Sequence, residues 1–312
     1  MRPIPASFAT AAFLGVLVIA LLVSSPILSS SKAPAEGHVF KDDHSAMSAL
    51  FEVPSSPRAE KELMLATTTS VDATGLLDLL AEEFEKGSGI RLKWIAVGTG
   101  AALRQARDGN ADAVLVHARK LEEEFLRDGY GVNRRVVARN LFMIVGPTDD
   151  PAGVSEAQNL TGALVRIKTS GYSFVSRGDH SGTHTRELEL WALAGGRPDK
   201  NYLETGQGMA QTLRVAAERQ GYCLTDSATF FGVEGLHGLR PVFDNSPDLE
   251  NIYAVIAVNP VKAPSVRYEE AMAFIAFLTS PRGQKLIADF KGKSDRLLFE
   301  AIAGQPGVDT DK

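Results

Sequence analysis

Residues 176–184, SRGDHSGTH, form the densest group of polar side chains able to bind an anion. They contain the permanent cation Arg177, several hydroxyl groups and two glycines, and they precede a segment whose spacing predicts a helix. Glycine allows the backbone to turn so that consecutive N–H groups point in one direction. The start of a helix adds unpaired N–H donors and a partial positive charge. Together these groups predict a pocket for a small anion.

Two turns upstream have the same character. Residues 66–70 (ATTTS) and 97–100 (VGTG) each follow a predicted strand and lead into a predicted helix. Ligands of open α/β sheets bind at the carboxyl ends of the strands. Three donor-rich turns of this kind favour a binding protein for a compact oxyanion over a catalyst. The residues expected to line the site from these two turns are Thr68, Thr69, Ser70, Gly98, Thr99 and Gly100.

Arg177 is the strongest single candidate for a ligand contact. Its guanidinium stays charged and offers forked donors that match an oxyanion. The alternative is an ordinary surface ion pair with Asp179. Because a carboxylate would repel an anion, we expect Asp179 to support the site, either by orienting Arg177 or by capping the following helix.

Ser181, Gly182 and Thr183 can donate hydroxyl and backbone hydrogen bonds from the start of the predicted helix. Simple capping of that helix uses the same donors, so the residues alone leave both roles open. We expect His184 to pack against the helix or support the site. Ser181, His184 and Asp179 are also the residue types of a hydrolase triad. However, triad members converge from distant segments, and the chain has no Gly-x-Ser-x-Gly elbow, so hydrolysis is the lesser alternative.

No cofactor or coordinating metal is expected. The Gly98–Thr99–Gly100 turn falls short of a dinucleotide fingerprint, and the chain has no Gly-rich loop ending in Lys-Ser/Thr. His117, His180 and His184 have no third ligand at a suitable spacing. The single cysteine, Cys223, lies in an apolar segment and is expected to be buried and inert.

Composition limits the partners of the protein. The chain has 312 residues, with 33 Lys and Arg against 38 Asp and Glu, for a formal net charge of -5. The absence of a Lys/Arg-rich run argues against nucleic acid, whose phosphates need a basic surface. An anion must therefore be held by local geometry rather than by the overall field of the protein.

The first residues resemble an export signal. Residues 8–23 are almost entirely apolar, and Ala33-Pro34-Ala35 offers a small-x-small cleavage pattern. We therefore expect residues 1–35 to be a signal peptide, or alternatively an uncleaved membrane anchor. Either way, the body of the protein is expected outside the cytoplasmic membrane. Residues 36–60 have mixed charge and no periodicity, which predicts a linker.

From Lys61 onward, short apolar runs alternate with amphipathic segments, which predicts an α/β protein with parallel strands. Two lobes fit best, each a mostly parallel sheet flanked by helices, with a ligand cleft between them. Gly146-Pro147 is a plausible crossing point. The predicted division is 61–146 with 250–297 for lobe 1, 147–249 for lobe 2, and 298–312 for a tail.

Five segments occur in an order that resembles a known family. They are residues 67–70, 97–100, 129–135, 176–184 and 206–209. Together they resemble the tungstate-binding extracytoplasmic proteins of ABC importers, within the type II periplasmic binding protein class. The similarity runs from about Leu63 to Phe290.

This resemblance implies a fold and a function. The fold is two α/β lobes joined by two strand-like crossovers, and the lobes close on a dehydrated tetrahedral dianion. The ligand is tungstate first and molybdate second, with sulfate or phosphate as the alternative oxyanion. The family also implies that Arg177 is a ligand residue and that no metal or cofactor is used. It further implies delivery to a membrane permease driven by an ATPase, and a monomeric protein.

Overall fold

The computed structural model describes residues 61–293 and 295–305. The predicted signal peptide and linker, and residues 306–312 of the predicted tail, lie outside the described residues. Among the helices of the described ranges, none combines the length and the apolar character that a membrane crossing requires.

Lobe 1 is built on a sheet with the strand order β10-β4-β9-β3-β1-β2. β1 (Lys61–Thr68) pairs in parallel with both β2 (Ile90–Val97) and β3 (Ala113–Val116). β9 (Glu250–Val258) runs antiparallel to β3 and to β4 (Gly131–Pro147), and β10 (Glu300–Ala301) runs antiparallel to β4. The sheet is therefore mixed rather than mostly parallel, because the returning crossover strand β9 is inserted beside β3.

Alternating side chains of the central strands bury both faces of this sheet. On β1, Leu63 and Leu65 face one apolar cluster and Ala66 faces the other, as the period of a strand requires. The first cluster includes residues of α2 (Leu76–Ser88), α9 (Tyr268–Thr279) and α10 (Pro281–Asp289). The second includes residues of α3 (Thr99–Arg107) and α4 (Arg119–Arg127). Helices on both sides leave the carboxyl ends of β1, β2 and β3 as the open edge.

One ion pair is buried inside lobe 1. Glu122 of α4 is fully buried, and its carboxylate accepts from Arg134 at 2.9 Å. Burial raises the pKa of Glu122, while the Arg134 guanidinium opposes that rise. The pair fixes α4 against β4, just behind the open edge of the sheet.

Lobe 2 uses the second half of β4. Residues 142–145 pair with β7 (Cys223–Asp226) and residues 144–147 pair with β8 (Leu239–Phe243), both antiparallel. β5 (Phe174–Ser176) pairs in parallel with β6 (Tyr202–Glu204). The helices of this lobe are α5 (Leu160–Ser170), α6 (Gly182–Leu193), α7 (Met209–Arg219) and α8 (Ser227–Gly232). Trp191 of α6 meets Phe174 of β5 edge-to-face in the core of the lobe.

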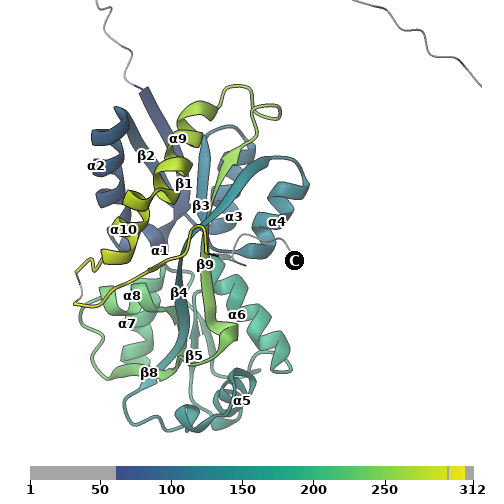
Figure 1. Cartoon of the computed structure of the whole chain (residues 1–312). Coiled ribbons are helices and arrows are strands. Elements are labelled where there is room, and N and C mark those ends of the chain that lie inside the picture. Colours follow the sequence, from purple (N-terminus) through teal and green to yellow (C-terminus); the bar gives the residue numbers. More distant parts are fainter. Residues whose placement is uncertain (1–60, 294, 306–312) are drawn as a thin grey trace, which may run out of the picture. The chain divides into compact units, whose positions relative to one another are not determined.

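β4 and β9 connect the two lobes (Figure 1). β4 pairs with β9 as far as Leu141 and then pairs with β7 from Phe142. The change of sheet thus lies between residues 141 and 142, not at Gly146-Pro147, because one continuous strand serves both sheets. The C-terminal boundary also differs, since Leu298, Phe299 and Ile302 are buried in lobe 1. Residues 298–305 therefore belong to the lobe and are not a tail.

Short helices connect several of these elements. α1 (Thr69–Ala73) follows β1 directly, and its cap is the side chain of Thr68, which accepts from Val71 N. The one-turn helices η2 (Val154–Glu156) and η3 (Pro247–Leu249) lie before α5 and β9, respectively.

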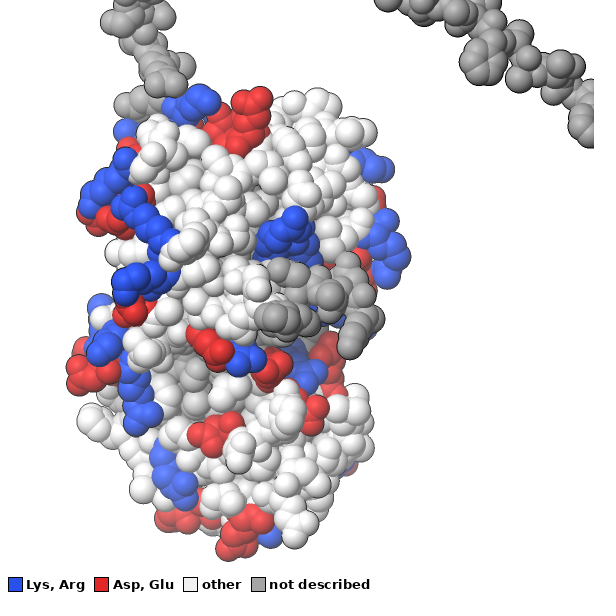
Figure 2. Space-filling view, in the orientation of Figure 1, with Lys and Arg blue, Asp and Glu red and all other residues white. Residues whose placement is uncertain are grey.

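On the face shown in Figure 2, acidic and basic side chains are interspersed rather than gathered by sign.

Candidate anion-binding site

The three predicted turns meet between the lobes. Nη2 of Arg177, after β5, lies 3.4 Å from Oγ1 of Thr69, after β1. A methyl group added to Gly98, after β2, would lie 3.7 Å from the Asp179 carbonyl oxygen. A methyl group added to Gly182 would lie 3.0 Å from Oγ1 of Thr99. The sequence-predicted residues of all three turns are therefore close neighbours.

Arg177 is a buried cation. Its side chain is only 2% exposed, and it donates to Asp179 Oδ2 from Nε at 3.1 Å and from Nη2 at 2.5 Å. The ion pair is thus not the ordinary surface pair that was the alternative. Asp179 orients the guanidinium, and its Oδ1 accepts from Ser181 N at 3.1 Å. The pair has no net charge, and the hydrogen bonds to Arg177 and Ser181 engage both oxygens of the carboxylate.

Two threonine hydroxyls in the site are orphaned. Thr99 and Thr183 are fully buried, and within the described residues neither Oγ1 has a hydrogen-bond partner. Leaving a buried hydroxyl unpaired costs about 1–3 kcal/mol, so such a group calls for an explanation. A ligand that accepts from both lobes would provide the missing partner.

Helix starts add backbone donors. α3 begins after Gly98, which has no side chain to cap it, so its first N–H groups keep their donor capacity. At α6, the Ser181 hydroxyl accepts from His184 N at 3.3 Å. Ser181 therefore caps the helix, and its hydroxyl hydrogen is still available. Gly100 lies in the first turn of α3, where an added methyl would approach Arg104 rather than α6.

The hydroxyl groups of the turn after β1, those of Thr68, Thr69 and Ser70, have different hydrogen-bond partners. Thr69 reaches Arg177, as described above. Thr68 Oγ1 and Ser70 Oγ lie 3.0 Å apart, and Ser70 Oγ lies 3.1 Å from His117 Nε2. Thr68 and Ser70 therefore belong to a hydrogen-bonded group around His117, and only Thr69 touches the arginine directly.

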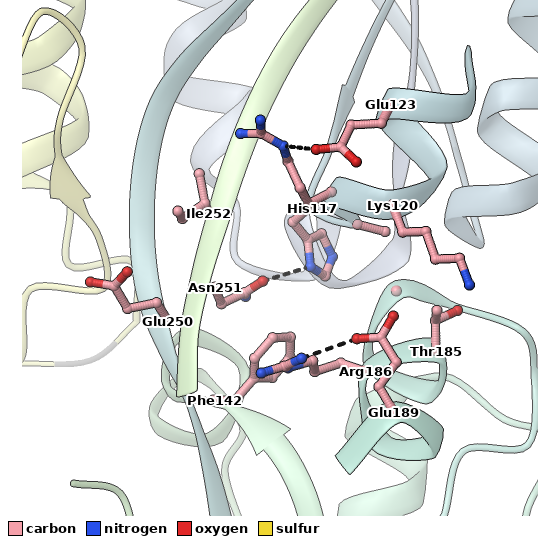
Figure 3. Close-up of a pocket in the computed structure, with 13 residues that line it drawn as sticks. His117, Lys120, Glu123, Phe142, Thr185, Arg186, Glu189, Glu250, Asn251 and Ile252 are labelled. Carbon is pink, nitrogen blue, oxygen red and sulfur yellow. Dashed lines mark hydrogen bonds and ion pairs between the residues drawn. The ribbon is translucent and has the colours of Figure 1, made fainter. Parts of the chain in front are cut away.

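His117 and Asn251 complete the site, and neither was among the predicted site residues. His117 follows β3, and its Nδ1 lies 2.9 Å from Asn251 Oδ1 on β9 (Figure 3). Gly182 lies against the His117 ring, since a methyl there would be 3.2 Å from Cε1. The sequence held one signal: His117 ends a strand at the same sheet edge as Thr68. Nothing in the sequence paired it with Asn251.

A cavity of 310 Å³ opens beside His117 at the crossover strands. Its walls include Phe142, Gly182 and Asn251, together with charged residues of α4 and α6. Figure 3 shows the labelled Lys120 side chain extending toward Thr185 of the other lobe. This cavity connects the protein surface to the His117 side of the site.

His184 supports the turn rather than forming a catalytic pair. Its Nδ1 accepts from His180 N at 3.0 Å, which holds His180 at a left-handed φ of 57°. Burial lowers the pKa of His184. The Ser181 hydroxyl bonds the backbone of His184 and not its ring, and Asp179 is engaged by Arg177. His184 Nδ1 and the Asp179 carboxylate, which a triad would join to each other, are thus hydrogen-bonded to other groups.

α6 itself carries a buried acid, Glu187, whose carboxylate accepts from the Tyr202 hydroxyl. Burial raises the pKa of Glu187 to about 7.

Cys223 is also buried, and burial raises the pKa of its thiol, as expected for an inert cysteine. Across residues 61–293 and 295–305, no three His, Cys, Asp or Glu side chains are grouped so as to hold a metal ion.

Residues 52–282 match the family described as PBP superfamily domain. The tungstate-binding protein TupA of Peptoclostridium acidaminophilum is 41% identical over 252 residues, which cover 80% of this chain and 88% of the relative. The protein of the same name from Campylobacter jejuni is 44% identical over 228 residues, covering 71% and 84%. A solved structure, the tungstate ABC transporter from Geobacter sulfurreducens, is 47% identical with a TM-score of 0.68. It covers 74% of this chain and 100% of its own.

Proposed function

This chain belongs to the PBP superfamily, and from that premise we propose that it is the substrate-binding component of an ABC importer. Its ligand is a tetrahedral oxyanion, tungstate first and molybdate second. Two relatives and one solved structure that are 41–47% identical carry tungstate in their names. The observation that carries the proposal is the buried Arg177 of lobe 2, whose Nη2 reaches Thr69 of lobe 1, together with the orphaned hydroxyls of Thr99 and Thr183, one from each lobe.

The available donors are sufficient for tight binding. A hydrogen bond to a charged group contributes about 1.5–3 kcal/mol, and a helix start contributes about 0.3–1 kcal/mol. The donors are the Arg177 guanidinium, the three hydroxyls of Thr69, Thr99 and Thr183, and the starts of α3 and α6. Together they can reach the roughly 8–12 kcal/mol of micromolar to nanomolar affinity, while offsetting dehydration of the dianion.

The site favours a fully deprotonated oxyanion. Asp179 Oδ2 accepts twice from Arg177 and Oδ1 accepts from Ser181 N, so little of the carboxylate's acceptor capacity remains for a protonated ligand. Phosphate retains a proton near neutral pH, and that proton needs an acceptor, whereas tungstate and molybdate bring none. The donor-rich site therefore favours tungstate and molybdate over phosphate, and cavity size must separate them from sulfate. Sulfate and phosphate are the alternative ligands that the experiment distinguishes.

Isothermal titration calorimetry with tungstate, molybdate, sulfate and phosphate tests the proposal. We expect saturable binding of tungstate and molybdate, and little heat from sulfate or phosphate. Arg177→Ala should abolish the binding, whereas Arg166→Ala, which removes an exposed cation of lobe 2 paired with Glu156, should leave it intact. Saturation by sulfate or phosphate alone, or full tungstate affinity in Arg177→Ala, would refute the assignment.

The cellular setting is part of the same proposal. The protein is exported, with residues 1–35 acting as a signal peptide or as an uncut anchor. It works as a monomer that delivers the oxyanion to a membrane permease with its ATPase. Intact mass of the exported protein distinguishes cleavage from retention, and light scattering checks the monomer. Accumulation of tungstate by cells that lack the gene tests delivery.

A further inference from the structure

A chain of hydrogen bonds fixes the proton on His117. Asp226 at the end of β7 is an acceptor, so the Asn140 amide must present its Nδ2 to it, at 3.2 Å. Asn140 Oδ1 then accepts from Asn251 Nδ2 at 2.8 Å, which turns Asn251 Oδ1 toward His117 Nδ1. Because Asn251 Oδ1 can only accept, the Nδ1 of His117 must carry the hydrogen. A neutral His117 therefore has a bare Nε2.

The bare Nε2 determines what Ser70 can do. Ser70 Oγ lies 3.1 Å from Nε2, so with a neutral ring its hydroxyl hydrogen points at His117. In that state Ser70 cannot donate to a ligand in the cleft. If Nε2 gains a proton, the direction of the bond reverses, because the ring now donates and the Ser70 hydroxyl hydrogen can turn to another acceptor, either Thr68 Oγ1 or a ligand. Protonation of His117 thus adds a donor to the site.

The charge balance of the pocket favours that protonation when a dianion arrives. Arg177 is already paired with Asp179, so the ligand-free site has no net positive charge. Placing two negative charges in a buried site is costly unless nearby charge compensates them. We propose that oxyanion binding is coupled to uptake of one proton at Nε2 of His117, which turns Ser70 into a ligand donor. This inference rests on the proposed function and names a regulation of the same site.

The charged groups around His117 are consistent with this role. Burial lowers the pKa of His117, and Arg177 lowers it further, while Asp226 raises it. Tyr253 stacks near the ring at 4.8 Å between centroids. In the cavity beside the ring, Arg119, Lys120, Glu123, Arg186, Glu189 and Glu250 supply three cations and three carboxylates. Burial and Arg177 thus favour the neutral ring in the ligand-free site, and the cavity beside His117 lets solvent approach the ring.

Calorimetry of tungstate binding in buffers of different ionisation enthalpy measures the proton directly. At each pH from about 6 to about 8, the range in which histidine titrates, the slope of the observed enthalpy against the buffer enthalpy gives the protons taken up. We expect uptake approaching one proton in part of this range. The affinity should fall by up to about tenfold per pH unit on the alkaline side, because one proton enters the binding equilibrium.

Two variants assign the proton. His117→Gln keeps a hydrogen-bonding group near Ser70 but does not titrate, so it should bind tungstate with no proton uptake and a flat pH dependence. Glu187→Gln removes a buried group of α6 whose pKa is raised to about 7, and it should retain the uptake. Proton uptake that persists in His117→Gln, or tungstate binding without uptake by the unaltered protein, would overturn this inference alone. If the unaltered protein does not bind tungstate at all, the proposed function itself fails.

Discussion

Replacing the orphaned threonines by valine separates ligand binding from folding. Valine has nearly the shape of threonine, so Thr99→Val and Thr183→Val remove a hydroxyl without opening a cavity. In the ligand-free protein these hydroxyls have no partner among the described residues. Their removal therefore loses no hydrogen bond, and an unpaired buried hydroxyl costs about 1–3 kcal/mol. The free energy of unfolding should be unchanged or raised in both variants.

The affinity for tungstate, unlike the free energy of unfolding, should fall in both variants. Each hydroxyl that donates to a dianion contributes about 1.5–3 kcal/mol, so each variant should weaken tungstate binding by about 10- to 150-fold. Calorimetry measures the affinity, and urea unfolding without ligand measures the stability. The combination of weaker binding with undiminished stability is the signature of a hydroxyl that serves only the ligand.

Thr67→Val is the matched control. Thr67 is also fully buried at the end of β1, but its hydroxyl donates to the Leu115 carbonyl at 2.8 Å. This variant should lose about 1 kcal/mol of stability and keep the affinity for tungstate. If Thr99→Val and Thr183→Val instead lose stability and bind tungstate normally, the two hydroxyls are structural and the proposed site is wrong.

Three further changes probe the lobes. Gly182→Ala places a methyl 3.0 Å from Thr99 Oγ1 and 3.2 Å from His117 Cε1, so it should push the two lobes apart and weaken tungstate binding at least tenfold, measured by calorimetry. The pKa of Glu187 is raised from the usual 4.5 to about 7. Its ionisation therefore opposes folding, and stability should fall by about 3 kcal/mol as pH rises from below 4.5 to above 7. Urea unfolding across this range should show the fall, and Glu187→Gln should remove it; an unchanged slope would assign the titration to another group. Arg134→Ala leaves Glu122 buried and unpaired, so unfolding should require about 3–5 kcal/mol less, and a loss below about 1 kcal/mol would show that water replaces the guanidinium.

The local chemistry of the site was predictable from the sequence. A strand followed by a donor-rich turn and a helix is encoded within about ten residues, so Thr69, Thr99 and Arg177 were identified without any tertiary information. Asp179 lies two residues from Arg177, and the structure gives it one of the two supporting roles that were considered, since it orients Arg177 while Ser181 caps α6. Ser181 shows why the capping question stayed open, since one hydroxyl can cap α6 and still donate.

Other features depended on contacts between distant segments. The antiparallel position of β9 makes the sheet of lobe 1 mixed, and a strand's direction in a sheet is not encoded in its own residues. Leu298 and Phe299 are buried because they pack into the apolar cluster that earlier parts of the chain form in lobe 1. From the sequence alone, such an apolar C-terminal segment cannot be distinguished from a tail. Similarly, because β4 is one continuous strand in both sheets, the sequence shows no break at the residue where the chain passes from one sheet to the other.

The arrangement of the site itself was decided by the tertiary structure. His117 and Asn251 are separated by 134 residues, and only the pairing of β3 with β9 brings them together. Likewise, the Thr99 hydroxyl has no partner and faces the other lobe, where a methyl added to Gly182 would lie 3.0 Å from it. The sequence by itself determined which groups can donate to an anion, because that property is local. The fold decided which of those donors lack a partner, because satisfaction of a hydrogen bond depends on every atom that surrounds it.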